Sequence, residues 1–143
     1  SVLALKKEVS EKYEVGTYGN TMCANPKALD IGFETLNRLD KNVSKNIVKQ
    51  GNNFVNMLNT LKHLYPHVIE EVTGTGLLIA AHINKKYSVV GENGLEMNCR
   101  KRGLNVIHGG ENALRFTPYF LINENEIALI KHILKDVFDD VCI

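Results

Sequence analysis

Apolar residues repeat at helical spacing in two long stretches of the first half of this chain. The first stretch begins at Pro26, and Asn25 is a favourable N-cap before a proline at the first helical position. A break at 40–42 separates it from a second stretch over 43–61, which ends before Pro66. The pattern therefore predicts two consecutive amphipathic helices.

The pattern then changes to short apolar runs. Val68–Thr73 and Leu77–Ile83 read as strands, and Gly74-Thr75-Gly76 between them reads as a turn. The second run is nearly all apolar, so we expect this strand to be buried on both faces.

A third helix is predicted over 89–102, with Gly103 as its C′ residue and basic side chains in its last turn. Short strands follow at 104–107 and 113–116, on either side of a loop at 108–112.

Asn123 and Glu126 form a capping-box pattern, and the apolar stripe over 127–141 predicts a terminal helix. Together these elements predict an α/β or α+β fold, with a small, mostly antiparallel sheet covered by helices. The best domain boundary lies near 39–44. We expect the chain before it to belong to a larger unit and the chain after it to form a small domain.

Composition narrows the function classes. The chain has 143 residues and a net charge of +1, which gives no electrostatic case for nucleic acid or a membrane surface. Its three cysteines, Cys23, Cys99 and Cys142, are widely spaced, so neither a zinc site nor a disulfide framework is expected, and a reduced intracellular compartment fits best. None of the five histidines has a convincing metal-ligand spacing, so no metal site is predicted.

The loop Gly16–Pro26 contains two glycines and two threonines and leads into a helix N-terminus. Such a loop offers N–H and hydroxyl donors to a phosphate. The alternative from composition alone is that Thr21 simply turns or caps the chain before the helix.

Several motifs, in order, resemble those of class III aminotransferases, which are fold-type-I pyridoxal-phosphate enzymes. The matching segments are Gly16-Thr17-Tyr18-Gly19-Asn20-Thr21 with Asn25-Pro26, Val72-Thr73-Gly74-Thr75-Gly76-Leu77-Leu78, Arg102-Gly103-Leu104, Leu114-Arg115-Phe116-Thr117-Pro118 and Ile122-Asn123-Glu124-Asn125-Glu126-Ile127.

This resemblance implies pyridoxal 5′-phosphate as cofactor and amino transfer from an amino donor, such as an ω-amino acid, to a 2-oxo acid. It implies that Thr21 and the backbone at Asn20 bind the cofactor phosphate of a partner subunit, hence a homodimer. It also implies that Arg115 binds a substrate carboxylate. The alternative for this arginine is an ordinary ion pair with Glu111, Glu92 or Glu96.

By the same resemblance, residues 1–40 are the end of the large cofactor-binding domain and 41–143 are the small C-terminal domain. The lysine that forms the Schiff base would lie before Ser1, so we expect no catalytic residue and no activity in this chain alone. The expected compartment is cytoplasmic, or the mitochondrial matrix in a eukaryote. The alternative function is a non-catalytic interaction or assembly module with the same fold.

Overall fold

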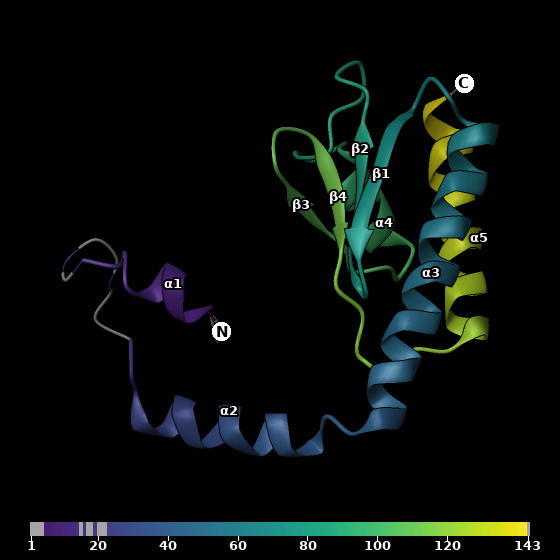
Figure 1. Ribbon diagram of the computed structural model, residues 1–143. Coiled ribbons are helices and arrows are strands. Elements are labelled where there is room, and N and C mark those ends of the chain that lie inside the picture. The colour runs from purple at the N-terminus through teal and green to yellow at the C-terminus, as the bar shows by residue number, and fades with distance from the viewer. Residues whose placement is uncertain (1–4, 15, 17–18, 20–22, 143) are drawn as a thin grey trace. The chain divides into compact units, whose positions relative to one another are not determined.

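The computed structural model describes residues 5–14, 16, 19 and 23–142 (Figure 1). The chain divides into two compact units, Ser1–Asp40 and Lys41–Ile143. The apolar run Val2-Leu3-Ala4-Leu5 also predicts a short strand at the N-terminus, but all of this run except Leu5 lies outside the described residues.

The first unit contains helix α1 (Lys7–Ser10), which the sequence did not predict, and helix α2 (Pro26–Arg38), which it did. The Asn25 side chain caps α2 by accepting a hydrogen bond of 3.2 Å from the backbone N–H of Ala28. None of the side chains of α2 is buried in the described structure.

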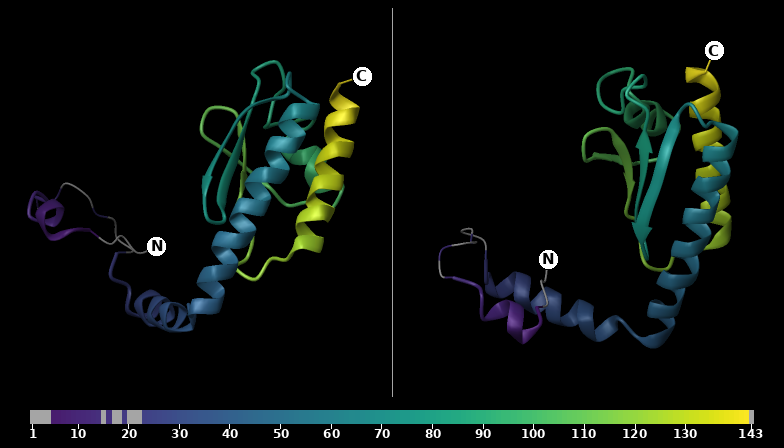
Figure 2. Two further views of the ribbon diagram at one scale, coloured as in Figure 1. Left: turned by 45° about the vertical axis from the view of Figure 1, so that its right-hand side comes forward. Right: turned by 45° about the horizontal axis from the view of Figure 1, so that its top comes forward.

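The second unit holds a four-stranded sheet with order β1-β2-β4-β3, in which every neighbouring pair is antiparallel. Helices α3 and α5 lie side by side against one face of this sheet (Figures 1 and 2). The predicted fold class is confirmed. The elements are α3 (Lys41–Leu64), β1 (Ile69–Thr75), β2 (Leu78–Ile83), α4 (Leu95–Lys101), β3 (Ile107–Gly109), β4 (Ala113–Phe116) and α5 (Glu124–Val141).

The predicted double-sided burial of β2 is wrong. Ile79, Ala81 and Ile83 are buried, whereas Ala80 is half-buried and Leu78 is 60% exposed. Burial alternates because α3 and α5 cover only one face of the sheet, so each strand has an inner and an outer side.

Other boundaries also differ from the sequence prediction. Strand β1 extends through Gly74 and Thr75, which the sequence assigned to the turn, so the turn itself is shorter than predicted. Helix α4 begins at Leu95 instead of residue 89, because Gly91 (φ +101°) and Gly94 (extended, φ −69°, ψ 160°) keep the preceding chain out of the helical conformation. Strand β3 begins at Ile107, and this places His108 and Gly109 in the sheet instead of in a loop. The turn after α4 is as predicted, with Gly103 at φ +85°.

The core of the second unit forms where one face of α3 and one face of α5 meet the inner side of the sheet. Its largest fully buried side chains include Phe54, Leu58, Leu61, Ile69, Ile79, Leu114, Leu134 and Phe138. The rings of Phe54 and Phe116 lie 5.2 Å apart, which joins α3 to β4 at the centre of this core.

Gly51 brings α3 against the turn of the β1–β2 hairpin. A Cβ atom at Gly51 would lie 2.2 Å from the carbonyl oxygen of Gly76, far inside van der Waals contact. Gly76 itself has φ +57°, as the tight two-residue turn between Thr75 and Leu78 requires. Two glycines are therefore needed at this contact, one for space and one for backbone conformation.

We predict that Gly51→Ala destabilises the second unit by about 1–3 kcal/mol, because helix and turn must separate to admit the methyl group. In an ordinary helix interior, Gly→Ala raises the free energy of unfolding by roughly 1 kcal/mol. A decrease would therefore distinguish the tight contact at Gly51 from simple helix propensity. Denaturant unfolding measures the effect. The matched control is Asn52→Ala at the next, exposed position of α3, where we expect no loss; equal stabilities for the two variants would refute the packing constraint.

Tyr65, the residue after α3, contacts the C-terminal part of α5. Its hydroxyl donates a hydrogen bond of 2.5 Å to Oδ1 of Asp139, and its ring packs edge-on against Phe138 at 5.4 Å. Burial, followed by the nearby Asp139 carboxylate, raises the pKa of Tyr65 to about 12. The hydrogen bond from Tyr65, followed by that from Lys135, lowers the pKa of Asp139.

A carboxyl group whose pKa is lower in the folded state stabilises the fold above its unfolded pKa, and this stabilisation is lost as the pH falls through the folded value. We therefore predict that Tyr65→Phe lowers stability at pH 7 and that its deficit relative to wild type shrinks below about pH 4. Thermal unfolding between pH 3 and 8 measures this. In a cycle with Asp139→Asn, additive losses would contradict the link.

Candidate functional site

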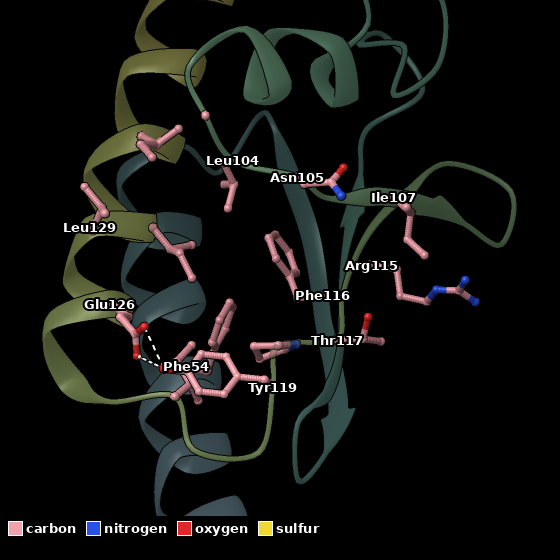
Figure 3. A pocket seen from close by; sticks show the side chains of 15 residues that line it. Phe54, Leu104, Asn105, Ile107, Arg115, Phe116, Thr117, Tyr119, Glu126 and Leu129 are labelled. Atoms are coloured by element: carbon pink, nitrogen blue, oxygen red, sulfur yellow. Dashed lines mark hydrogen bonds between the residues drawn. The ribbon is translucent and has the colours of Figure 1, made fainter. Parts of the chain in front are cut away.

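Arg115 lies in the middle of β4, on the side of the sheet that the helices leave uncovered. Its neighbours Leu114 and Phe116 are buried in the core, whereas Arg115 is exposed. Figure 3 shows the Arg115 and Phe116 side chains on opposite sides of the strand. Because side chains alternate along β4, Leu114 and Phe116 point into the core and Arg115 between them points outward.

The neighbours of Arg115 across the sheet are small or apolar. It pairs with Ala80 of β2 and with Ile107 of β3. Gly109 is its diagonal neighbour on β3, and a Cβ atom there would lie 3.3 Å from the Cβ of Arg115. Neither flanking strand thus places a charged side chain directly opposite the guanidinium.

The ion pairs that sequence reasoning considered for Arg115 do not form. Glu111 binds Lys85 at 2.8 Å. Glu96 binds Arg100 at 3.0 Å and the His108 ring at 2.9 Å. The hydrogen bond from His108 is the main cause that lowers the pKa of Glu96.

The Arg115 side chain makes no hydrogen bond or ion pair with any residue that the structure describes. A guanidinium presents a planar fork of donors that matches a carboxylate or a phosphate oxygen pair. The arrangement can therefore bind an anion supplied from outside the described chain.

Asn112, in the turn between β3 and β4, holds the chain that precedes α4. Its side-chain amide donates to the carbonyl oxygens of Ile83 (3.0 Å), Asn84 (3.4 Å) and Tyr87 (2.9 Å), and its Oδ1 accepts from the N–H of Val89 (3.1 Å). Sequence reasoning placed Asn112 in a loop and assigned it no role. No local pattern reveals partners that lie more than twenty positions away.

The chain after β4 is held by two further polar side chains. The Asn46 amide donates to the carbonyl oxygens of Phe120 (2.8 Å) and Ile122 (3.1 Å). Glu126 accepts from the Asn123 N–H at 2.9 Å, which completes the predicted capping box, and also from the Tyr119 hydroxyl at 2.7 Å. These bonds fix the path of the chain on the C-terminal side of Arg115.

A cavity of about 390 Å³ opens beside β4, between the sheet and α5. Figure 3 shows apolar side chains over most of its wall, including Phe54, Leu104 and Phe116, while the Arg115 guanidinium points away from them. The apolar wall of the cavity is the edge of the hydrophobic core, and the Arg115 guanidinium faces outward at the rim of the cavity.

The two predicted phosphate-binding residues, Asn20 and Thr21, lie outside the described residues. Around them, Gly16 has φ +94° and Ala24 has φ 55°, both in the left-handed region that tight turns use. A Cβ atom at Gly16 or Gly19 would meet no described heavy atom within 4 Å.

The described residues contain no cluster of three or more histidine, cysteine or acidic side chains that could hold a metal ion. All three cysteines are free, and burial raises the pKa of the Cys99 thiol to about 11. His67 Nε2 lies 3.2 Å from Cys142 Sγ. None of the described helices has both the length and the apolar character that a membrane crossing requires.

Comparison with known proteins finds similarity to class III aminotransferases along nearly the whole chain. The family model described as aminotransferase class-III matches residues 1–138. The mitochondrial acetylornithine aminotransferase of Neurospora crassa is 30% identical over 140 residues, which cover 97% of this chain and 29% of that protein. The acetylornithine aminotransferase of Prochlorococcus marinus is 32% identical over 127 residues, which cover 88% of this chain and 30% of that protein.

Among solved structures, the acetylornithine aminotransferase of Elizabethkingia anophelis matches 92% of this chain and 34% of its own, with a TM-score of 0.69 and 24% identity. At this identity the match shows a shared fold. The chain spans about three tenths of the length of the curated relatives it matches. The family model, the sequence relatives and the fold agree: this chain belongs to the class III aminotransferase family.

Proposed function

We propose that this chain is the C-terminal part of a pyridoxal-phosphate-dependent aminotransferase of the acetylornithine and ornithine type. In this proposal Lys41–Ile143 is the small domain and Ser1–Asp40 is the end of the large cofactor-binding domain. The reaction moves an amino group from an ω-amino acid donor to a 2-oxo acid. Family membership and the names of the relatives support this assignment.

The observation that carries the proposal within this chain is the outward-facing Arg115 without an ionic partner among the described residues. Donor and acceptor both carry a carboxylate, and a guanidinium fork binds a carboxylate through two parallel hydrogen bonds. Arg115 thereby orients the substrate at the reacting centre. The cofactor, when bound, supplies the electron sink for amino transfer.

Asn20 and Thr21 complete the proposed site from another subunit. The Thr21 hydroxyl and the Asn20 N–H bind the cofactor phosphate of the partner, so the active assembly is a homodimer. None of the lysines of this chain serves as the cofactor-linked lysine, and the isolated chain is inactive. The three free cysteines fit a cytoplasmic or matrix enzyme.

Arg115→Ala in the complete protein should lower kcat/KM for a carboxylate donor by about 30-fold, on the order of 2 kcal/mol, chiefly through a higher KM. Steady-state kinetics with acetylornithine and 2-oxoglutarate measures the change. The matched control is Arg100→Ala, which removes an exposed arginine of α4 that pairs with Glu96 and should leave KM unchanged. An unaltered KM in the Arg115 variant would refute the assignment.

The isolated 143-residue chain, mixed with pyridoxal 5′-phosphate, should transfer no amino group from acetylornithine, ornithine, lysine or 4-aminobutyrate to 2-oxoglutarate. The complete protein, assayed in parallel, should act on at least one of these donors. Glutamate formation is the readout. Turnover by the isolated chain would contradict the proposal, and an inactive complete protein would favour a non-catalytic assembly module.

A further inference from the structure

We infer that Gly109 is a positioning residue for Arg115: the missing side chain of Gly109 leaves the surface on which the arginine stem lies. This inference rests on the proposed role of Arg115 as the group that binds the substrate carboxylate. It assigns part of that role to a second residue, on the neighbouring strand.

The register of the β3–β4 hairpin places the two residues on one face. Ile107 pairs with Arg115, and Gly109 pairs with Ala113. Residues two apart on a strand share a face, so Gly109 and Arg115 are diagonal neighbours on the uncovered side of the sheet.

The contact runs along the aliphatic part of the arginine. A Cβ atom built on Gly109 would lie 3.3 Å from Cβ, 3.5 Å from Cδ and 3.9 Å from Cγ of Arg115. The arginine stem therefore extends over the bare backbone of β3, and any side chain at position 109 enters the volume beside it. Gly109 is not in the left-handed region, so backbone conformation does not call for a glycine here.

Little else restrains the guanidinium. The cross-strand neighbour on the other side, Ala80, carries a single methyl group. Glu111 and Glu96 are bound to other cations, and no described residue forms an ion pair or a hydrogen bond with the Arg115 side chain. The direction of the head group is therefore set by the uncharged surface beside the stem, which Ala80, Gly109 and the apolar side chain of Ile107 form.

This matters because bidentate binding of a carboxylate is sensitive to position. Displacing a substrate-orienting group by about 1 Å can reduce catalysis by up to a hundredfold. A side chain at position 109 would tilt the stem and move the guanidinium fork away from the carboxylate while leaving its charge in place.

The test is Gly109→Val in the complete, cofactor-loaded protein. We expect KM for the carboxylate donor to rise on the order of tenfold, with kcat changed less than about twofold, since a β-branched residue suits an exposed strand. Gly109→Ala should give a smaller rise in KM, because its Cβ requires a shift of only a few tenths of an ångström. The graded order Gly, Ala, Val is part of the expectation, and the alanine variant keeps the test available if the valine variant does not fold.

Two further variants separate this inference from the proposed function. Arg115→Ala alone must raise KM; if it does not, the proposed role of Arg115 fails, whatever Gly109 does. Given that rise, Gly109→Val in the Arg115→Ala background should add nothing, because no stem remains to displace. An unchanged KM in Gly109→Val, or a full additional rise in the double variant, would overturn the positioning role.

Gly110→Ala is the matched hairpin control. It strains the same turn, because Gly110 has φ +56°, but an added Cβ there meets no heavy atom within 4 Å. It should lower the unfolding temperature and leave KM unchanged. A rise in KM equal to that of Gly109→Val would attribute the effect to hairpin distortion and overturn the inference.

Discussion

The contact of Gly51 with Gly76 sets the distance between α3 and the β1–β2 hairpin, and the second unit is built on that distance. Backbone meets backbone there, with no room for a Cβ atom between them. The apolar residues of α3 that follow Gly51 then reach the inner side of the sheet, where the ring of Phe54 packs against that of Phe116. Because β2 is an inner strand of the sheet, its placement against α3 also determines where β4, and therefore Arg115, lies.

Because helices cover the sheet of the second unit on one side only, the two sides of its strands have different surroundings. The same alternation that buries Leu114 and Phe116 turns Arg115 outward. A cation in this position costs little free energy while it is hydrated, and it keeps its donors available because Glu111 and Glu96 bind other cations. The inner face of the sheet thus provides stability and the outer face presents the charged group for which we propose a binding role, through alternate residues of one four-residue strand.

Loops are held around this strand by side chains that bond to backbone. Asn112 anchors the chain before α4, and Asn46 anchors the chain after β4. Both use amide groups, which satisfy backbone donors and acceptors without adding charge. The strand that carries Arg115 is consequently fixed at both of its ends, which is what the proposed role of Arg115 in orienting a substrate requires.

The sequence by itself determined the local elements and the family. Periodicity located α2, α3 and α5, the capping pair located the start of α5, and glycines located the β1–β2 turn, because these signals act within a few residues. Ordered motifs pointed to class III aminotransferases, in agreement with the family match. Tertiary structure alone decided three further features: that β2 has an exposed side, that Asn112 anchors distant carbonyl groups, and that Gly109 lies under the stem of Arg115. These facts depend on which strands become neighbours and which face the helices cover, and a one-dimensional pattern carries no information on contacts between residues far apart in the chain.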